Sequence, residues 1–419
     1  MRHQKMNTTF SYLLIFIIFG VIVYLVTYKY NVTLTPRIDA NFKAIKPNFH
    51  ALNNIKPLSL NGPKLSKVLG QYYNFPVQQN STNAPVICII SLGGTYNVND
   101  LNAYWRANGF SAASFKAPTF QNVDGTKNAP NIKKQSTTDG SIENTLDIEI
   151  IMTLCPTANI RVFFGQNSTN GFYNAINAAR TYLLSFSNRA KIISISWGTN
   201  ELNFAPSDLM RYDNLFKLCN TNNIAVCCAS GDYGADDGIG FLSLNFPSSS
   251  PNVISCGGTS VKTSGETVWS HDRFYNWGGG GGVSYIFKKH PSQATSDETY
   301  RISAPSLLGT ALVDNRSSPD IAMNADPQNG WSIYFNGAYT TIGGTSAVSP
   351  AFSAFLGLCN NSTNIIPKLY NAPRNVFKDI TVGNIDDLGK GLYYATRGID
   401  QCSGLGSING IALMPHIIA

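Results

Sequence analysis

The stretch PVICIISLGG, residues 85–94, decides the fold class of this chain. Its first half is an unbroken apolar run rich in β-branched side chains, and a Gly-Gly turn ends it at 93–94. A short continuous run of this kind is typical of a parallel strand that is covered on both faces. The stretch therefore predicts a buried strand whose carboxyl end lies at SLGG.

Further runs of the same kind alternate with helical patterns along the chain. The predicted strands are 159–165 (NIRVFFG), 191–198 (KIISISWG) and 224–231 (IAVCCASG), and the predicted helices are 65–73, 98–110, 147–155, 169–184 and 206–222. This alternation indicates an α/β fold, with a parallel sheet and helices on both of its faces. Ligands of such folds bind beyond the carboxyl ends of the strands, which here are SLGG, SWG and SGD.

The N-terminal part of the chain carries a separate signal. Residues 10–28 (FSYLLIFIIFGVIVYLVTY) are uncharged and long enough to span nearly the whole hydrocarbon core of a bilayer. Arg2 and Lys5 precede this segment, which favours a cytoplasmic N-terminus. We predict a single-pass signal anchor with the rest of the chain on the lumenal or extracellular side. A cleaved signal peptide followed by secretion is the alternative.

These features divide the chain into four parts. Residues 1–9 form a short tail and residues 10–28 the transmembrane segment. Residues 29–63 contain spaced prolines and little periodicity, which indicates a tether. Residues 64–419 read as one α/β domain.

Composition excludes some partners. The formal net charge is +7, but Lys and Arg are scattered and form no basic stripe, so nucleic-acid binding has little support. The eight cysteines have no zinc-site spacing. Several of them lie in apolar strand-like runs, which favours buried free thiols over a disulfide framework.

A candidate nucleophile lies in GGTSAVSP, residues 343–350. Its glycines allow close approach of another backbone, and Ser346 would lie at a helix N-terminus, where an oxyanion is favoured. A purely structural loop is the alternative. None of the five histidines begins a helix after a strand, so a Ser-His-Asp mechanism is disfavoured.

Acidic residues offer another base. In DGSIENTLDIEI (139–150), Glu143 and Asp147 are four residues apart and share one helix face. If the pair is half-buried, one carboxyl keeps its proton and its pKa is raised, and Glu143 can serve as general base with Asp147 orienting it. A solvated face without function is the alternative.

A third carboxyl group follows a predicted strand. Asp232 lies in IAVCCASGDYGADDG (224–238), directly after a Ser-Gly turn. In its neutral form it could donate a hydrogen bond to a developing oxyanion. The alternative is an aspartate that caps its own turn.

These motifs together resemble those of the sedolisin family, and of its kumamolisin branch in particular. The matching segments, in chain order, are IISLGGTYNVNDL, DGSIENTLDIEI, ISISWG, ASGDYG, FPSSSPNVISCGGT, ETVWS, WGGGGGVS, PDIAMNADP, IGGTSAVSP, VFKDIT, and GID followed by CSGLGS. Sedolisins are serine-carboxyl peptidases with a subtilisin-like fold and acidic pH optima. The resemblance covers roughly residues 64 to 412.

The resemblance implies a role for each catalytic residue. The ExxxD motif implies that Glu143 is the base for Ser346, with Asp147 behind it. SGDxG implies Asp232 as the acid of the oxyanion hole, and GGTSAxxP implies Ser346 as the nucleophile.

It also implies one Ca²⁺ ion and a set of substrate contacts. The predicted calcium ligands are the carboxylates of Asp379 and Asp400 and the backbone oxygens of Ile380, Thr396 and Gly398. The predicted substrate-binding residues are Trp197, Gly198, Gly279, Gly280 and Asn245. For the glycine run 278–282, a flexible loop is the alternative, and for the Asp/Gly loops a site without metal.

Three features depart from the family pattern. Ser91 stands where kumamolisins often carry a glutamate beside the tryptophan, which is expected to shift the pH optimum. Asn245 stands where some members carry an aspartate in the S1 pocket, so a preference for Arg or Lys there is doubtful. About 60 residues precede the predicted domain, fewer than the usual long propeptide.

The sequence thus predicts an acid-acting, calcium-stabilised serine-carboxyl endopeptidase whose substrates are polypeptides. Residues 10–28 would anchor it in a lipid bilayer, and the catalytic domain is expected to be monomeric. A tripeptidyl exopeptidase with the same chemistry and a membrane-tethered pseudoenzyme that only binds peptides are the alternatives.

Overall fold

The computed structural model describes residues 45–48, 50–51, 65–77, 83–131, 133–138, 140–270, 277–294, 314–386, 389 and 393–419. The chain divides into two units, residues 1–42 and 43–419, and the described residues all belong to the second. The predicted tail and transmembrane segment lie outside them, as does most of the tether. Within the described ranges, no helix combines the length and the apolar character needed to cross a bilayer.

A ten-stranded central sheet organises the domain. Its strands, in spatial order, are β17 (Phe377–Lys378), β18 (Ser407–Ile408), β14 (Ile321–Asn324), β10 (Ile254–Lys262), β8 (Ala225–Ala229), β6 (Lys191–Ile195), β3 (Val86–Ser91), β5 (Asn159–Phe164) and β4 (Thr119–Asn122), and β11 (Gly265–Val268) pairs with β10 outside this path. All pairs from β18 to β4 are parallel, while β17 and β11 are antiparallel to their neighbours. The four predicted strands are confirmed as β3, β5, β6 and β8 at the centre of this sheet.

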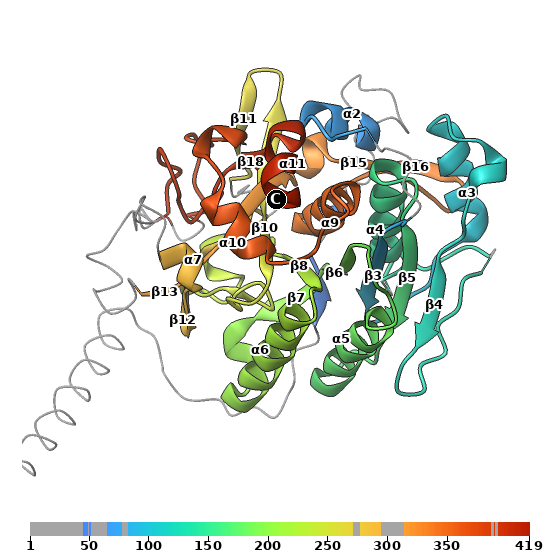
Figure 1. Ribbon diagram of the computed structural model, residues 1–419, viewed down its shortest axis with the longest axis horizontal. Helices are drawn as coiled ribbons and strands as arrows, with labels where there is room; N and C mark the ends of the chain where they lie inside the picture. The colour runs from blue at the N-terminus through green and yellow to red at the C-terminus, as the bar shows by residue number, and fades with distance from the viewer. Residues whose placement is uncertain are drawn as a thin grey trace, which may run out of the picture. The chain divides into compact units, whose positions relative to one another are not determined.

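Helices cover both faces of the sheet (Figure 1). On one face lie α5 (Thr169–Leu183) and α6 (Pro206–Thr221), and on the other α4 (Ser141–Leu154) and α9 (Val348–Leu358). The remaining helices are α2 (Leu65–Tyr72), α3 (Val98–Ala107), α7 (Pro291–Ala294), α10 (Ile365–Asn371) and α11 (Gly410–Ile418). The predicted α/β architecture is therefore correct.

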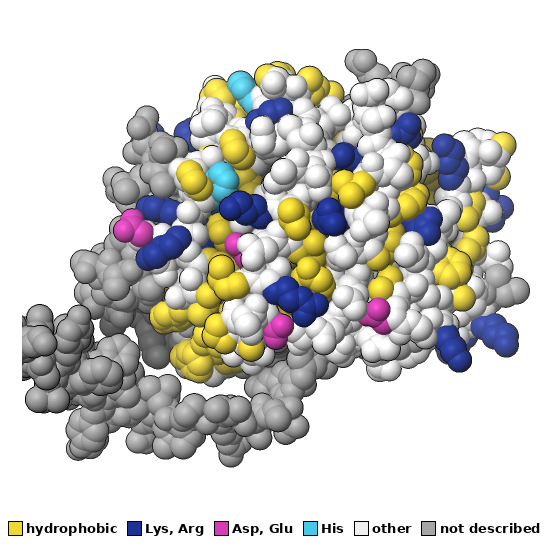
Figure 2. Space-filling view, turned by 60° about the horizontal axis from the view of Figure 1, so that its bottom comes forward, with side chains coloured by type: hydrophobic (Ala, Val, Ile, Leu, Met, Phe, Trp, Pro, Cys, Tyr) yellow, Lys and Arg dark blue, Asp and Glu magenta, His cyan; other side chains and the backbone are white. Residues whose placement is uncertain are grey.

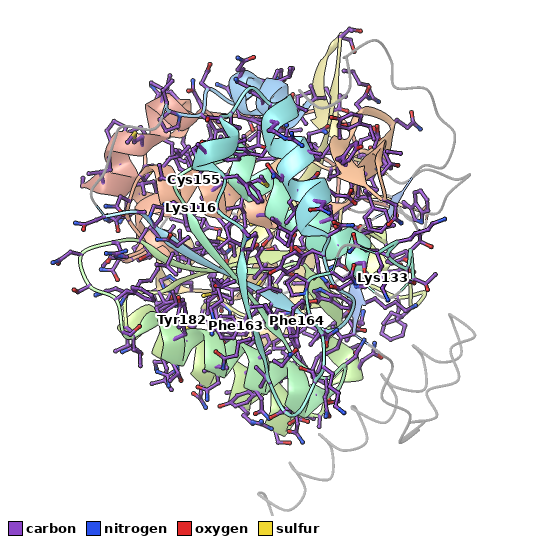
Figure 3. The ribbon with its side chains drawn as sticks, turned by 90° about the vertical axis from the view of Figure 1, so that its right-hand side faces the viewer. Lys116, Lys133, Cys155, Phe163, Phe164 and Tyr182 are labelled. Carbon is purple, nitrogen blue, oxygen red and sulfur yellow. The ribbon has the colours of Figure 1, made fainter. Side chains whose placement is uncertain are left out.

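Alternation along β5 shows how one strand supplies two cores. Phe163 packs with Tyr182 of α5, their ring centroids 5.8 Å apart, while Phe164 belongs to the core cluster on the other face (Figure 3). Successive side chains of a strand point to opposite faces. Both rings are fully buried, as expected for a strand between two helical layers.

Helix α4 lies wholly inside the domain. All of its residues are buried, so it lacks the polar stripe of a surface helix. It begins at Ser141, six residues before the predicted start, because Gly140 adopts a left-handed conformation (φ 91°) that ends the preceding loop. Glu143 and Asp147 consequently lie on the same helix.

Smaller sheets flank the central one. β7 (Trp197–Asn200) pairs with β1 (Lys46–Pro47) and β9 (Asn245–Phe246), β16 (Ala338–Gly343) pairs with β15 (Trp331–Phe335) and β2 (His50–Ala51), and β12 (Gly282–Lys288) pairs with β13 (Asn315–Ser318). β1 and β2 come from the predicted tether. Part of that segment is therefore docked on the domain, since backbone pairing can hold a strand that has no periodic pattern.

The cysteines and the surface charges can be compared with the predictions made from composition. All eight cysteines are buried free thiols, which confirms that prediction. On the face shown in Figure 2, Lys and Arg side chains lie apart from one another among neutral side chains.

Candidate active site

Ser346 lies at the junction of a strand and a helix. β16 ends at Gly343, Gly344 takes a positive φ of 114°, and a 3₁₀ turn over Thr345–Ala347 leads into α9. The serine is fully buried, and its hydroxyl donates a long hydrogen bond of 3.2 Å to the carbonyl of Ser196. The predicted helix N-terminus is thus preceded by a tighter turn.

The predicted acidic pair faces this turn from α4. Glu143 and Asp147 are fully buried, and α4 packs against both α9 and the turn that carries Ser346. Ser196, just after β6, donates its hydroxyl to Asp147 Oδ1 at 2.8 Å. Ser196 therefore links the carboxyl pair to the nucleophile through its side chain and its carbonyl. Sequence reasoning missed this residue, although its place after a predicted strand was a signal.

Burial dominates the electrostatics of the pair. Desolvation raises the pKa of Glu143 well above its usual range, and the charge of Asp147 raises it further, while the hydroxyls of Ser346 and Ser196 lower it. Desolvation likewise raises the pKa of Asp147, against the hydrogen bond from Ser196. Two carboxyls in one dry site cannot both ionise readily, so they share a proton over a wide pH range.

Asp232 contacts the turn that carries Ser346. It follows β8, and its Oδ1 accepts hydrogen bonds from the backbone N–H and the hydroxyl of Thr345, both at 2.8 Å. Desolvation raises the pKa of Asp232 to about 8, although these donors from Thr345 lower it. The carboxyl is therefore neutral over the acidic range and able to donate a proton in a hydrogen bond.

A backbone donor completes this side of the site. The N–H of Ser346 donates to the carbonyl oxygen of Asn48 at 2.9 Å. An amide donor on the nucleophile itself, together with a neutral Asp232 held on the adjacent Thr345, is the arrangement required to stabilise an oxyanion.

Trp197 and Gly198 form the edge predicted to bind substrate. Both lie in β7, antiparallel to Pro47 and Lys46 of β1. The Trp197 ring packs on Gly140, where an added Cβ would lie 2.8 Å from the ring. This close contact explains the glycine before the helix that carries the acidic pair.

Gly279 and Gly280 lie next to the turn that carries Asp232. Their N–H groups donate to the carbonyls of Trp269 and Gly231, both at 2.8 Å. A Cβ at Gly280 would lie 2.3 Å from the carbonyl oxygen of Ser230, so only glycine fits there. The run is thus packed in the fold, and its role in substrate binding stays a prediction.

A pocket of about 270 Å³ is lined in part by Asn48, whose carbonyl accepts the N–H of Ser346. Asn245 lines it together with Gly198, Tyr233 and Asp237. The Asn245 amide donates to both oxygens of Asp237, and desolvation raises the pKa of that carboxyl to about 7. An acidic side chain is therefore present in the pocket although Asn245 is neutral. Sequence reasoning missed Asp237, which GADDG could have signalled.

The predicted calcium residues come together in one loop region. The Asp379 carboxylate accepts from the N–H of Gly398 at 3.0 Å, and Asp400 accepts from the N–H of Thr396 at 2.8 Å. Two carboxylates beside backbone carbonyls give the hard oxygen donors that suit Ca²⁺. Within the described ranges no group of three or more His, Cys, Asp or Glu side chains could hold a metal, and this set contains only two.

The site has counterparts among known proteins. The model of the subtilase family matches residues 78–393. The chain belongs to the subtilase family. It is 36% identical over 363 residues to kumamolisin from Bacillus sp. strain MN-32, covering 84% of this chain and 63% of that protein. It is 30% identical over 380 residues to sedolisin from Pseudomonas sp. strain 101, covering 82% and 60%.

Structure comparison agrees. The fold matches Pseudomonas sedolisin, a serine-carboxyl proteinase solved with pseudo-iodotyrostatin, with a TM-score of 0.63 and 26% identity, over 82% of this chain and 96% of that structure. These similarities place the chain with the sedolisins, the serine-carboxyl peptidases, and confirm the resemblance seen in the sequence. The chain spans less than two thirds of the length of the curated relatives named above.

The buried carboxyls predict an unusual dependence of stability on pH. Asp232 has a pKa of about 8 in the folded domain against an ordinary value of 3.8. The folded state therefore binds more protons between about pH 4 and pH 8, and its stabilisation is complete at low pH and is lost as the pH rises. A tenfold difference in proton affinity between the folded and unfolded states corresponds to about 1.4 kcal/mol. We expect the free energy of unfolding in urea to fall from pH 4 to pH 8.

The measurement uses the Ser346→Ala background to prevent self-digestion. Asp232→Asn should flatten the decline, because asparagine does not ionise. Asp314→Asn, at an exposed carboxylate, should leave the slope unchanged. Stability that rises over this range would contradict the electrostatic account of the site.

Proposed function

We propose that the domain is an acid-acting serine-carboxyl endopeptidase. The observation that carries the proposal is the placement of Ser346 between a buried Glu143–Asp147 pair and an oxyanion site made by its own N–H and a neutral Asp232. This arrangement supplies a nucleophile, a base and an oxyanion hole without a histidine.

Acylation would use each of these groups once. Glu143 takes the proton of the Ser346 hydroxyl as Oγ attacks the substrate carbonyl carbon. The new oxyanion accepts hydrogen bonds from the Ser346 N–H and from protonated Asp232. Asp147 accepts a hydrogen bond from Ser196 and lies beside Glu143. The charge that changes on Glu143 during the transfer is therefore spread over both carboxyls of the pair. Collapse of the intermediate returns the proton from Glu143 to the leaving amine.

Deacylation would run the same sequence with water. Glu143 accepts a proton from a water molecule that attacks the acyl-enzyme ester, and the Ser346 hydroxyl is regenerated. The acid product leaves the oxyanion site. Asp232 must stay protonated throughout, which restricts the reaction to the acidic side of its pKa.

An endopeptidase is favoured over a tripeptidyl exopeptidase by the described backbone around Ser346. The N–H of Ser346 contacts the carbonyl of Asn48, so four described residues, 45–48, lie before the peptide bond at that carbonyl, and 50–51 pair with β16. A tripeptidyl exopeptidase would accept three residues before the cleaved bond. A peptide-binding pseudoenzyme is disfavoured because all four catalytic side chains are present.

Three further properties belong to the proposal. Asp379, Ile380, Thr396, Gly398 and Asp400 would hold one structural Ca²⁺ ion, joining the segments around 380 and 398. Residues 10–28 would anchor the protein in a bilayer, with the domain on the lumenal or extracellular side, or be removed before secretion. Polypeptides would be the substrates of a catalytic domain that is itself monomeric.

Activity on a denatured protein should peak at roughly pH 3 to 5, where carboxyls ionise in part. Ser346→Ala should abolish it, Glu143→Gln should lower kcat by about 10²- to 10⁴-fold, and Asp232→Asn by about 10²- to 10³-fold. Initial rates from pH 2 to 9 give the measurement. Glu149→Gln is the matched control, since Glu149 is an equally buried carboxyl of α4 that bonds Tyr334 instead of the catalytic serine.

An optimum near pH 8, or full activity in Glu143→Gln, would overturn this mechanism. A large loss in Glu149→Gln would assign the effect to general disruption of α4.

Removal of calcium should lower the melting temperature before it changes the chemistry. Ca²⁺ would link two loop segments, so EDTA should shift the melting temperature down by several degrees in the Ser346→Ala protein. Asp379→Asn and Asp400→Asn should remove that shift and weaken Ca²⁺ binding in calorimetry, while Asp314→Asn should not. A melting temperature that is indifferent to EDTA would exclude the calcium site.

A further inference from the structure

A pocket of about 730 Å³ lies at the far end of the helix that follows the nucleophile. α9 begins at Val348, directly after the turn that carries Ser346, and ends at Leu358, which lines the pocket. At 1.5 Å per residue, about 15 Å of helix separates these two ends. The pocket is therefore separate from the catalytic groups around Ser346.

The wall of this pocket comes from three parts of the chain. The end of α9 and the helix α11, which lie next to each other in Figure 1, form two of them. The third consists of the segments before and after residues 78–82, which include Val77 and Asn83. We call the cavity the α9–α11 pocket. Its volume lies within the range of about 300–1,000 Å³ that is typical of small-molecule sites.

The α9–α11 pocket presents apolar side chains to solvent. None of the residues that line it is charged, although Val77 is 92% exposed, Ile411 62% and Ile418 50%. Single exposed apolar side chains are normal on a protein surface, but these three line one pocket. Residues 78–82 are QQNST, a sequence without an apolar side chain to cover them. The pocket therefore suits a ligand that brings apolar groups of its own.

A cation lies at the rim of the α9–α11 pocket. Arg189 donates from Nη1 to the carbonyl of Ala84, which lies between two lining residues, at 3.4 Å. The next residue, Ala190, donates its N–H to Oδ1 of Asn360, itself a lining residue, at 3.0 Å. Within the described ranges Arg189 forms no ion pair, and its Nε is buried without a partner. Its charge is thus available to an anion, and no Asp or Glu lines the pocket.

The size of the pocket favours a small ligand over a second copy of the chain. A stable protein interface takes about 20–30 residues from each partner. Fewer than half of that upper number line the α9–α11 pocket. An elongated apolar molecule with one anionic end satisfies both the wall and the rim.

We propose that the α9–α11 pocket binds a long-chain fatty acid. Its acyl chain would lie against α9 and α11 and remove the exposed surface of Val77, Ile411 and Ile418 from water. Its carboxylate would pair with the guanidinium of Arg189, which forms no ion pair within the described ranges. Binding makes and breaks no covalent bond, and the proposal does not depend on peptidase activity.

Photo-crosslinking of the full chain tests the proposal. The Ser346→Ala protein, held in nanodiscs of zwitterionic phospholipid, is illuminated with a palmitate analogue that carries a diazirine at the end of its chain. Mass spectrometry then maps the labelled peptides. We expect label in the peptides that contain residues 357–358 and 411–418, and we expect excess oleate to remove it.

Ile411→Glu tests the wall of the pocket. A carboxylate at this position would repel the ligand and would have to be desolvated under the acyl chain, so labelling should fall at least about ten-fold. Leu218→Glu is the matched control, since Leu218 is 50% exposed on α6 and does not line the pocket. The melting temperature of each variant checks that the domain still folds.

Arg189→Gln tests the rim. It should weaken labelling by the palmitate analogue and leave labelling by the alcohol of the same chain length unchanged, because only the acid uses the guanidinium. Arg211→Gln should change neither, since Arg211 lies on α6 and has Asp208 3.8 Å away.

Three results would overturn the proposal. The first is label that is confined to residues 10–28, or that excess oleate does not reduce. The second is equal loss of acid and alcohol labelling in Arg189→Gln. The third is a dimer in light scattering that Ile411→Glu dissociates and oleate does not, which would assign the pocket to a second copy. Because the protein carries Ser346→Ala, each result is independent of the peptidase assays.

Discussion

The desolvation of three carboxyl groups around one serine is the constraint on which the rest of the site depends. Glu143 and Asp147 are fully buried, and the groups that lower their pKa are hydroxyls and, for Asp147, the Glu143 carboxyl, rather than cations. In such surroundings the neutral acid is favoured, so a proton stays in the pair and another on Asp232. The fold provides this by placing α4 wholly inside the domain, with the turn after β16 against it and Asp232 hydrogen-bonded to that turn. Glu143 and Asp232 are both carboxyl groups, but their positions make the first a base and the second a proton donor in a hydrogen bond.

Backbone groups form much of the edge beside the catalytic serine. These backbone groups are the edge of β7, the carbonyl of Ser196 and the N–H of Ser346. They would bind a peptide strand through main-chain hydrogen bonds. Side-chain selection is left to the pocket lined by Asn245 and Asp237.

Much of the fold followed from periodicity, and much of the site did not. The central strands were predictable because buried parallel strands are continuous apolar runs, as in 85–94. The apolar pattern placed the start of α4 at 147 because a fully buried helix has no amphipathic stripe, although the spacing of Glu143 and Asp147 already indicated helix from 143. The roles of Ser196 and Asp237 depend on contacts between distant segments, which spacing does not encode. The docking of residues 45–48 and 50–51 was not predicted for a related reason, since strand pairing through backbone groups leaves little trace in composition.

The central claim is that the Glu143–Asp147 pair keeps at least one proton while another stays on Asp232 at acid pH. Neutron diffraction from deuterated crystals of the Ser346→Ala protein at pH 5 would locate these protons directly. The account predicts at least one deuteron within the acidic pair and another on the Asp232 carboxyl. Three fully ionised carboxylates at that pH would contradict it.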